Sequence, residues 1–450
     1  MSKSEISIES ACKNALQVCE NNNITTIYLA YSGGVDSSVL IHSFNQVLSK
    51  GRAKNKAKRH IKAIAVHANH GLQSLADSWQ QHCELNCQLL GLEIHSKKLQ
   101  LDTEQLRING IEATAREARY KWFFEFIDSD HAALMTAHHQ GDQAETVLLN
   151  LIRGSGVAGL AGIRKQAERD SVMLMRPFLA VPENTILRYA RQHQLEWVED
   201  PSNNNTEFLR NRVRHDLLPL MENMRVGTSI NLARLAINMR DVEGLLEELA
   251  IEDLAGSVDC VPNPLDGSYH LPLNKVDKLS EPRVVNIIRH WLKLVGFQSP
   301  ARSVLLELAG WCRGEGKEKL TYQLSDGSFY GYRGTLYYVP DGEQDWLETG
   351  QWIELSKPWL MRGGRHLRMR TQPISDLESQ SFEVVNLSRQ DKCTRNDGST
   401  RSLAKLMQDH RIPIWRRSNL WGVKCNSDII WVAGVDNLLL ADNFRLEYVP

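Results

Sequence analysis

Short apolar runs alternate with longer amphipathic segments from about residue 24 to residue 200. The short runs have the length of buried strands, whereas the longer segments repeat their apolar residues at helical spacing. Strands that alternate with helices indicate a parallel sheet. We therefore predict an α/β fold built on a doubly wound parallel sheet. The predicted strands cover residues 27–31, 61–66, 92–99, 132–137 and 173–175, and the predicted helices cover 8–20, 37–48, 78–90, 111–126, a segment that opens after 138, and 182–193.

The alternation stops near residue 200, and the rest of the chain has a different pattern. Residues 220 to about 315 are rich in helical spacing, and residues 320–338 have β character with glycines at turns. The last hundred residues contain short strand-like runs and one predicted helix from Thr400 to about His410. We predict three domains: an N-terminal α/β domain over 1–219, a mostly helical domain over 220–345, and a small basic α+β domain over 350–450.

The most informative stretch directly follows the first predicted strand and reads Ser32-Gly33-Gly34-Val35-Asp36-Ser37-Ser38. The glycines let the backbone approach a ligand closely, and the serine hydroxyls add to the free N–H groups of a helix N-terminus. These groups together form a cradle suited to phosphate. The lysine of a G-x-x-x-x-G-K-[ST] loop is missing, and Asp36 stands near the glycines instead. A carboxylate repels phosphate unless a cation lies between them, so we predict that Mg²⁺ bridges Asp36 and a pyrophosphate.

Other polar residues follow the second and fourth predicted strands. His67, Asn69 and His70 would lie outside the carboxyl end of a strand, where doubly wound sheets bind ligands. They are candidates to line a nucleotide pocket. Asp142 and Glu145 lie three residues apart at the start of a helix, on one face. The helix dipole alone explains such carboxylates; a metal or a substrate amine is the functional alternative.

Four arginines are candidates to bind anions. Arg116 and Arg119 share a face of the helix predicted over 111–126. They either pair with an acidic neighbour or form a cationic wall beside phosphate or RNA. In a helix, Arg210 and Arg214 would lie one turn apart and could hold pyrophosphate, a tRNA phosphate or a carboxylate.

The composition is that of a globular protein, with a formal net charge of −1 over 450 residues. The distribution of charge is uneven, because residues 357–417 contain 13 Lys and Arg against 6 Asp and Glu. Such a segment is either a solvated surface or a basic face for a polyanion. The eight cysteines are scattered, which favours incidental thiols in a reducing cytoplasm. We expect no signal peptide and no membrane span.

The Ser32–Ser37 signature resembles that of the PP-loop ATP pyrophosphatases, enzymes with an adenine nucleotide α-hydrolase-like fold. They cleave ATP between its α- and β-phosphates and adenylate a substrate. Several further motifs together resemble the bacterial tRNA(Ile)-lysidine synthetase family: Asn69-His70-Gly71-Leu72, Asp142-Gln143-Ala144-Glu145-Thr146, Arg153-Gly154-Ser155-Gly156, Asp200-Pro201-Ser202-Asn203 and Arg210-Asn211-Arg212-Val213-Arg214. The resemblance covers the first 220 residues and returns more weakly at 363–365 and 403–416. Gly141-Asp142 departs from the family's two polar or acidic residues, so that only Asp142 can carry a carboxylate role there. Ala404-Lys405 and Pro413-Ile414-Trp415 are departures in the last domain.

This resemblance implies that ATP adenylates the C2 carbonyl oxygen of the wobble cytidine in the CAU anticodon of tRNA(Ile), and that the ε-amine of free lysine displaces AMP to give lysidine. It implies ATP and Mg²⁺ as cofactors, tRNA-binding roles for the two later domains, and a cytoplasmic ligase. The sequence leaves open whether the protein is a homodimer. The expected catalytic residues are Asp36, Asp142, Glu145, Arg116, Arg119 and Arg210. The expected ATP-binding residues are Ser32, Gly33, Gly34, Val35, Asp36, Ser37 and His70, with Asp36 also binding Mg²⁺.

Three other functions remain open from the residues. A sulfur-inserting tRNA thiolase needs reactive cysteines near the pocket, and Cys83 and Cys87 are the only close pair in the sequence. A small-molecule amide synthetase has little use for the basic segment at 357–417. A non-catalytic RNA-binding protein has no need of Asp36, Asp142 and Glu145 together.

Overall fold

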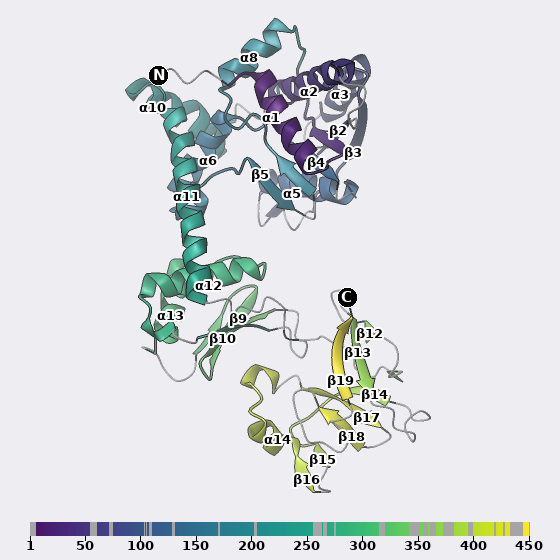
Figure 1. The fold of residues 1–450 in the computed structure, drawn as a ribbon, viewed down its shortest axis with the longest axis vertical. Coiled ribbons are helices and arrows are strands. Elements are labelled where there is room, and N and C mark those ends of the chain that lie inside the picture. Colours follow the sequence, from purple (N-terminus) through teal and green to yellow (C-terminus); the bar gives the residue numbers. More distant parts are fainter. Residues whose placement is uncertain are drawn as a thin grey trace. The chain divides into compact units, whose positions relative to one another are not determined.

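The chain forms two compact units, residues 1–244 and 245–450, and the division falls within helix α11 (Thr228–Leu254) (Figure 1). Among the described residues, no helix is long and apolar enough to cross a membrane. The bounds of the three domains expected from the sequence stay predictions. The computed structural model describes residues 6–54, 61–71, 75–102, 104, 106–107, 110–127, 131–169, 172–201, 205–254, 263, 268–273, 276–314, 320–341, 352–353, 359–360, 366–371, 382–394, 399–417, 420–425, 428–432 and 444–449.

A six-stranded sheet lies at the centre of the first unit, in the order β3-β2-β1-β4-β6-β5. Its first five strands in that order run parallel, and β5 pairs antiparallel with β6 at the edge. The predicted doubly wound sheet is therefore confirmed, whereas β5 was not predicted. The strands are β1 (Thr26–Ala30), β2 (Lys62–Asn69), β3 (Glu93–Lys98), β4 (Ala132–Met135), β5 (Gln166–Arg169) and β6 (Val172–Met175).

Alternate residues of these strands enter two separate cores, one on each face of the sheet. Ile27 and Leu29 belong to the core that α1, α2, α3 and α8 cover, and Tyr28 packs on the core that α5 covers. This alternation follows from the two-residue period of a strand. The helices are α1 (Ile8–Asn21), α2 (Val35–Lys54), α3 (Ala76–Leu89), α5 (Ile111–Phe126) and α8 (Glu183–Gln192).

The strand order reverses between β1 and β4. From β1 the chain continues to β2 and β3 on one side, and from β4 it continues to β6 on the other. Thr26 pairs with Lys62 on one neighbour and with Ala132 on the other, which places β1 between the two halves. The loops after β1 and β4 therefore open into one crevice, the place where such sheets bind ligands.

A helical segment beyond residue 208 packs against α6 (Gln140–Ile152), which follows β4. Ala144 and Leu148 of α6 share a small core with Val213 and Leu218. The segment that contains Arg210 and Arg214 forms a short α-helix and then a π-helix, whose wider turn is common at functional sites. The elements of this segment are α9 (Leu209–Arg212), the π-helix η2 (Val213–Leu217) and α10 (Leu218–Met224). A short helix, α7 (Val157–Leu160), follows α6 in the chain.

The second unit begins with helices that pack on an antiparallel sheet in the order β7-β10-β9-β8. Trp291, Leu305 and Phe329 are fully buried in the shared core. The helical and β patterns predicted up to residue 338 are confirmed here. The elements are β7 (Tyr269–Pro272), η3 (Val276–Lys278), α12 (Glu281–Leu294), α13 (Arg302–Cys312), β8 (Leu320–Gln323), β9 (Gly327–Tyr332) and β10 (Thr335–Pro340).

The described residues near the end of the chain are rich in strands and include a helix, as the α+β prediction required. Helix α14 (Leu403–Asp409) buries Leu403, Leu406 and Met407, the apolar side expected from the sequence. The strands form three small sheets: β11-β14-β17-β18, β12-β13-β19 and β15-β16. Their strands are β11 (Trp352–Ile353), β12 (Trp359–Leu360), β13 (His366–Thr371), β14 (Phe382–Asn386), β15 (Lys392–Thr394), β16 (Thr400–Ser402), β17 (Trp421–Cys425), β18 (Asp428–Val432) and β19 (Phe444–Val449), with η4 (Ile414–Arg416) after α14.

Candidate active site

The loop after β1 is held in shape by its own serines. The Ser37 hydroxyl donates a hydrogen bond to the Gly34 carbonyl at 2.9 Å and accepts one from the Ser32 N–H at 3.2 Å. The Ser32 and Ser37 hydroxyls also lie 3.1 Å apart. These bonds within the loop shape a cradle at the start of α2.

Gly33 has a structural reason to be glycine. Its φ of +88° lies in the left-handed region, and a Cβ there would lie 2.9 Å from Val198 Cγ2 and 3.1 Å from Cys83 Sγ. The Gly33 carbonyl also accepts a hydrogen bond from the Val198 N–H at 3.0 Å. The back of the loop is therefore packed against the rest of the unit, and Val35 packs against the same core.

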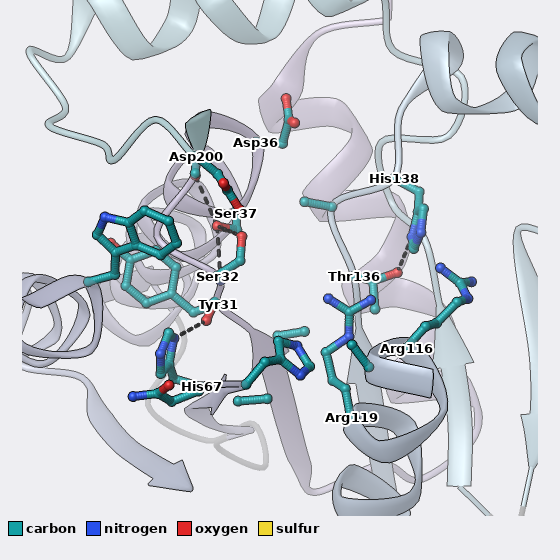
Figure 2. A pocket seen from close by; sticks show the side chains of 18 of the residues that line it. Tyr31, Ser32, Asp36, Ser37, His67, Arg116, Arg119, Thr136, His138 and Asp200 are labelled. Carbon is teal, nitrogen blue, oxygen red and sulfur yellow. Dashed lines mark hydrogen bonds between the residues drawn. The ribbon is translucent and has the colours of Figure 1, made fainter. Parts of the chain in front are cut away.

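A cavity of about 740 Å³ opens at the crevice (Figure 2). Nine of the residues predicted for the site line it, and they come from the loop after β1 and the start of α2, from the loop after β2, from α5, from the start of α6 and from α9. The fold thus brings together residues that lie up to 178 positions apart in the chain, since Ser32 and Arg210 both line it. The nine are Ser32, Gly34, Asp36, Ser37, His70, Arg116, Arg119, Asp142 and Arg210.

Asp36 has an oxygen suited to a metal ion. Its Oδ1 atom is buried and has no hydrogen-bond partner among the described residues. Burial raises the pKa of Asp36 to about 6, because a charged carboxylate is poorly solvated there, and nearby Asp142 and Glu183 add to the shift. A cation would satisfy the free oxygen and offset this charge. Mg²⁺ commonly binds one or two carboxylates together with substrate phosphates, so Asp36 beside a phosphate cradle fits it.

His139 is a site residue that the sequence prediction missed. It caps α6, and its Nδ1 accepts a hydrogen bond from the Gly141 N–H at 3.0 Å. The ring proton of the neutral form must then be on Nε2, which lies 3.8 Å from Asp36 Oδ2 and 3.6 Å from Asp142 Oδ2. The signal was available, because His138 and His139 directly follow a buried strand.

The acidic pair on α6 is paired with the two arginines of the 210–214 segment. Glu145 accepts hydrogen bonds from Arg210 Nε at 2.8 Å and from Arg214 Nε at 2.5 Å, and only 3% of its side chain is exposed. Asp142 accepts one from Arg210 at 2.9 Å. Both arginines therefore bind carboxylates of α6, one of the kinds of partner expected from the sequence. Glu145 reaches the cavity only through the arginines, whereas Asp142, Arg210 and Arg214 line it.

Burial alone would raise the pKa of Asp142, but His139, His138 and Arg210 outweigh it and hold the pKa below its ordinary value. Asp142 therefore remains a carboxylate at neutral pH. Asp142 also stays negatively charged at pH values near 6, where Asp36 gains and loses its proton. The two carboxyl groups differ because their environments within the site differ.

Two histidines on the cavity wall are neutral at physiological pH. Burial and the charge of Arg119 lower the pKa of His70 to about 4. Burial likewise lowers the pKa of His138, with Arg176 and Arg116 adding to the effect. Both rings can therefore donate or accept hydrogen bonds without adding charge to the cavity.

The cysteine pair has none of the properties of reactive thiols. Cys83 and Cys87 are fully buried, and burial raises the pKa of both. A reactive cysteine needs exposure and a lowered pKa. Neither thiol is suited to sulfur transfer.

The phosphate cradle after β1 lies at the switch point of a doubly wound sheet, beside an acidic residue. These features define a nucleotide-binding domain of the PP-loop class. The family model described as a PP-loop domain matches residues 7–221. A second family model, described as the TilS substrate binding domain, matches residues 271–337.

Similar proteins extend over nearly the whole chain. The tRNA(Ile)-lysidine synthase of Pseudomonas syringae pv. tomato is 32% identical over 435 residues, which are 94% of this chain and 92% of that protein. The tRNA(Ile)-lysidine synthase of Alkalilimnicola ehrlichii is 34% identical over 90% of this chain and 89% of that protein. Among solved structures, the U34-tRNA thiolase NcsA from Methanococcus maripaludis has 20% identity and a TM-score of 0.42, covering 52% of this chain and 78% of that one. The chain belongs to the tRNA(Ile)-lysidine synthase family, and it is a PP-loop ATP-utilising enzyme.

Proposed function

We propose that the enzyme joins free lysine to C2 of the wobble cytidine in the CAU anticodon of tRNA(Ile). The C2 carbonyl oxygen attacks the α-phosphorus of ATP, the bond to the bridging oxygen breaks, and pyrophosphate leaves. The lysine ε-ammonium then loses a proton, and the resulting amine forms a bond to C2 as the C2–O bond breaks and AMP leaves. The observation that carries this proposal is the single cavity that joins the phosphate cradle to Asp142 and to a wall of arginines.

The first half of the reaction uses the loop after β1. Ser32, Gly34 and Ser37 line the cavity, and the Ser32 hydroxyl and the Gly34 and Ser37 N–H groups would bind the β- and γ-phosphates. Asp36 would hold Mg²⁺ through its unpartnered oxygen. Mg²⁺ there supplies positive charge that offsets the charge on the departing pyrophosphate.

Asp142 and Glu145, the two acidic residues of α6, would have different roles. Asp142 lines the cavity as a carboxylate and would bind the lysine ε-ammonium. Glu145 is buried and would fix Arg210 and Arg214, so that their remaining donors face the substrate phosphates. The neutral rings of His70 and His138 would orient polar groups of the two nucleotides without binding phosphate charge.

Arg116 and Arg119 occupy the opposite wall, on α5. A single-stranded anticodon can place its base in such a cavity while arginines contact the phosphates. The basic residues of the second unit would hold the body of the tRNA, since backbone contacts position an RNA without reading its sequence.

The test is release of AMP and pyrophosphate by the purified protein, with free lysine and unmodified tRNA(Ile) bearing CAU each present or omitted. We expect AMP release and sustained pyrophosphate release, together with incorporation of labelled lysine into the tRNA, only when both are present. With tRNA alone, pyrophosphate release should stop after one equivalent per tRNA adenylated, and no AMP should appear. The control is a tRNA that has the same CAU anticodon but carries another amino acid, such as tRNA(Met). Turnover without tRNA would favour an amide synthetase, and turnover that requires a sulfur donor would favour a thiolase.

A further inference from the structure

Tyr120 lies between the two arginines of α5 and the core beneath them. Only 7% of its surface is exposed, and it packs with Phe123 and Phe124 against the sheet. The guanidinium carbons of Arg116 and Arg119 lie 5.1 Å and 5.7 Å from the centroid of its ring. Both distances are within the range of cation–π interactions.

Helical spacing explains one of the two contacts, because Arg116 precedes Tyr120 by one turn and the two residues share a face of α5. Arg119 directly precedes Tyr120 in the chain. The two guanidinium groups act on different histidines of the cavity. Arg116 adds to the burial that lowers the pKa of His138 after β4, and Arg119 adds to the burial that lowers the pKa of His70 after β2. Figure 2 shows both arginines rising from α5 toward the cavity.

The far end of Tyr120 is fixed to the sheet. Its hydroxyl is hydrogen-bonded to the side chain of Arg176, which directly follows β6 and is itself 8% exposed. Arg176 in turn donates a hydrogen bond to the Arg164 carbonyl at 2.7 Å. The Tyr120 hydroxyl is therefore bonded to a residue at the end of β6, and the Tyr120 ring contacts the two arginines that line the cavity.

We propose that Tyr120 is a positioning residue that holds Arg116 and Arg119 in place for phosphate groups of the substrates. Without the ring, two flexible side chains of like charge would repel each other and lose a defined direction. This inference rests on the proposed function in one respect: it takes ATP or the tRNA backbone as the source of the phosphate.

The experiment compares Tyr120→Leu, Tyr120→Phe and Phe124→Leu in the full-length protein. Tyr120→Leu removes the ring, and Tyr120→Phe removes only the bond to Arg176. Phe124→Leu is the matched control, because Phe124 stacks on Tyr120 at 6.1 Å and is equally buried, on the same helix. We expect Tyr120→Leu to raise the KM for ATP or for tRNA roughly five- to thirty-fold, corresponding to the loss of desolvated cation–π contacts. Tyr120→Phe and Phe124→Leu should change both KM values by less than about twofold.

The two phosphate sources give different results. A rise confined to the KM for ATP assigns the arginines to the nucleotide, whereas a rise confined to tRNA, with a shallower dependence of tRNA affinity on salt, assigns them to the RNA backbone. Equal changes in Tyr120→Leu and Phe124→Leu would overturn the proposal, since packing alone would then explain them. So would a Tyr120→Leu variant that loses only thermal stability.

Tyr120→Met fills the space with a flexible apolar side chain and replaces Tyr120→Leu in the comparison if the latter does not fold. Equilibrium binding of Mg·ATP and of a CAU anticodon stem-loop, measured for the same variants, separates this inference from the proposed function. If the unaltered protein binds both ligands but forms no lysidine, the proposed function fails. The effect of Tyr120 on binding then still decides the inference.

Discussion

Asp36→Asn is expected to stabilise the fold while it removes activity. Asn keeps the size and shape of the side chain but has no charge to desolvate. The folded-state pKa of Asp36 is about 6, above the ordinary value of 3.8, so folding favours the neutral carboxyl. The stabilisation that accompanies the neutral form is present below pH 3.8 and is lost as the pH rises toward 6.

The shift sets the magnitude of this effect. A rise from 3.8 to about 6 corresponds to about 3 kcal/mol of destabilisation for the ionised form. Because 36% of the side chain is exposed, solvent screens part of that penalty, and we expect about 1–2 kcal/mol above pH 7. For a unit of this size this is a rise in melting temperature of about 2–8 °C.

The assay is thermal unfolding of the full-length wild type and Asp36→Asn proteins at several pH values from 4 to 8. The difference in melting temperature should be small at pH 4, grow to pH 6 and stay constant above it. Mg²⁺ with pyrophosphate should raise the melting temperature of the wild type and have little effect on the variant, because a ligand stabilises only the state that binds it. AMP release by the variant should fall by about 100-fold or more, and tRNA binding should be unchanged.

Asp216→Asn is the control, since Asp216 is an exposed carboxylate of the same unit and its neutralisation should matter little. A variant Asp36→Asn that is less stable than the wild type at pH 8 would refute the desolvation argument. Full activity of that variant would refute the assignment of Asp36 to the metal.

Three further predictions concern the surroundings of the cavity. Glu145→Gln should lower the free energy of unfolding by about 2–3 kcal/mol in urea, because it leaves two partly buried arginines without their charged partner; an unchanged value would show that the pairing is not needed for folding. Replacement of Cys83 and Cys87 together by Ser should leave lysine- and tRNA-dependent AMP release intact, and specific loss of product in a folded variant would support the thiolase alternative. Gly33→Ala should cost about 1–3 kcal/mol and raise the KM for ATP, whereas Gly91→Ala, with a φ of +63° and open space at its Cβ, should cost stability without affecting ATP; equal KM values would contradict the close packing behind the loop.

Local signals in the sequence were sufficient for most elements of the first unit. The helix predicted over 111–126 is confirmed at both ends, since Gly110 adopts a φ of +79° before it and the backbone leaves helical angles at Ile127. By contrast, β5 (Gln166–Arg169) has too many polar residues to read as a strand. It forms because β6 offers an open edge, with Gln166 opposite Met175. Pairing of that kind depends on a neighbour rather than on the strand's own pattern.

The same distinction applies to the site. Residues directly after a strand could be placed at the crevice from the sequence, because parallel strands end at one edge of the sheet. The pairing of Arg210 with Glu145 could not, since 65 residues separate them and the contact depends on how α6 packs against the segment containing η2. That packing, with a π-helix in place of a regular turn, has no sequence pattern of its own.

The support behind Gly33 has a consequence for local unfolding. The hydrogen bonds within the phosphate loop are between near neighbours, but the loop is also tied to Val198, which precedes the cavity residue Asp200. The Val198 amide proton cannot exchange with solvent until its bond to Gly33 opens. The loop and the 198–200 segment should therefore open together and exchange their amide protons as one cooperative unit, and a nucleotide that binds only the loop should slow exchange at Val198 as well.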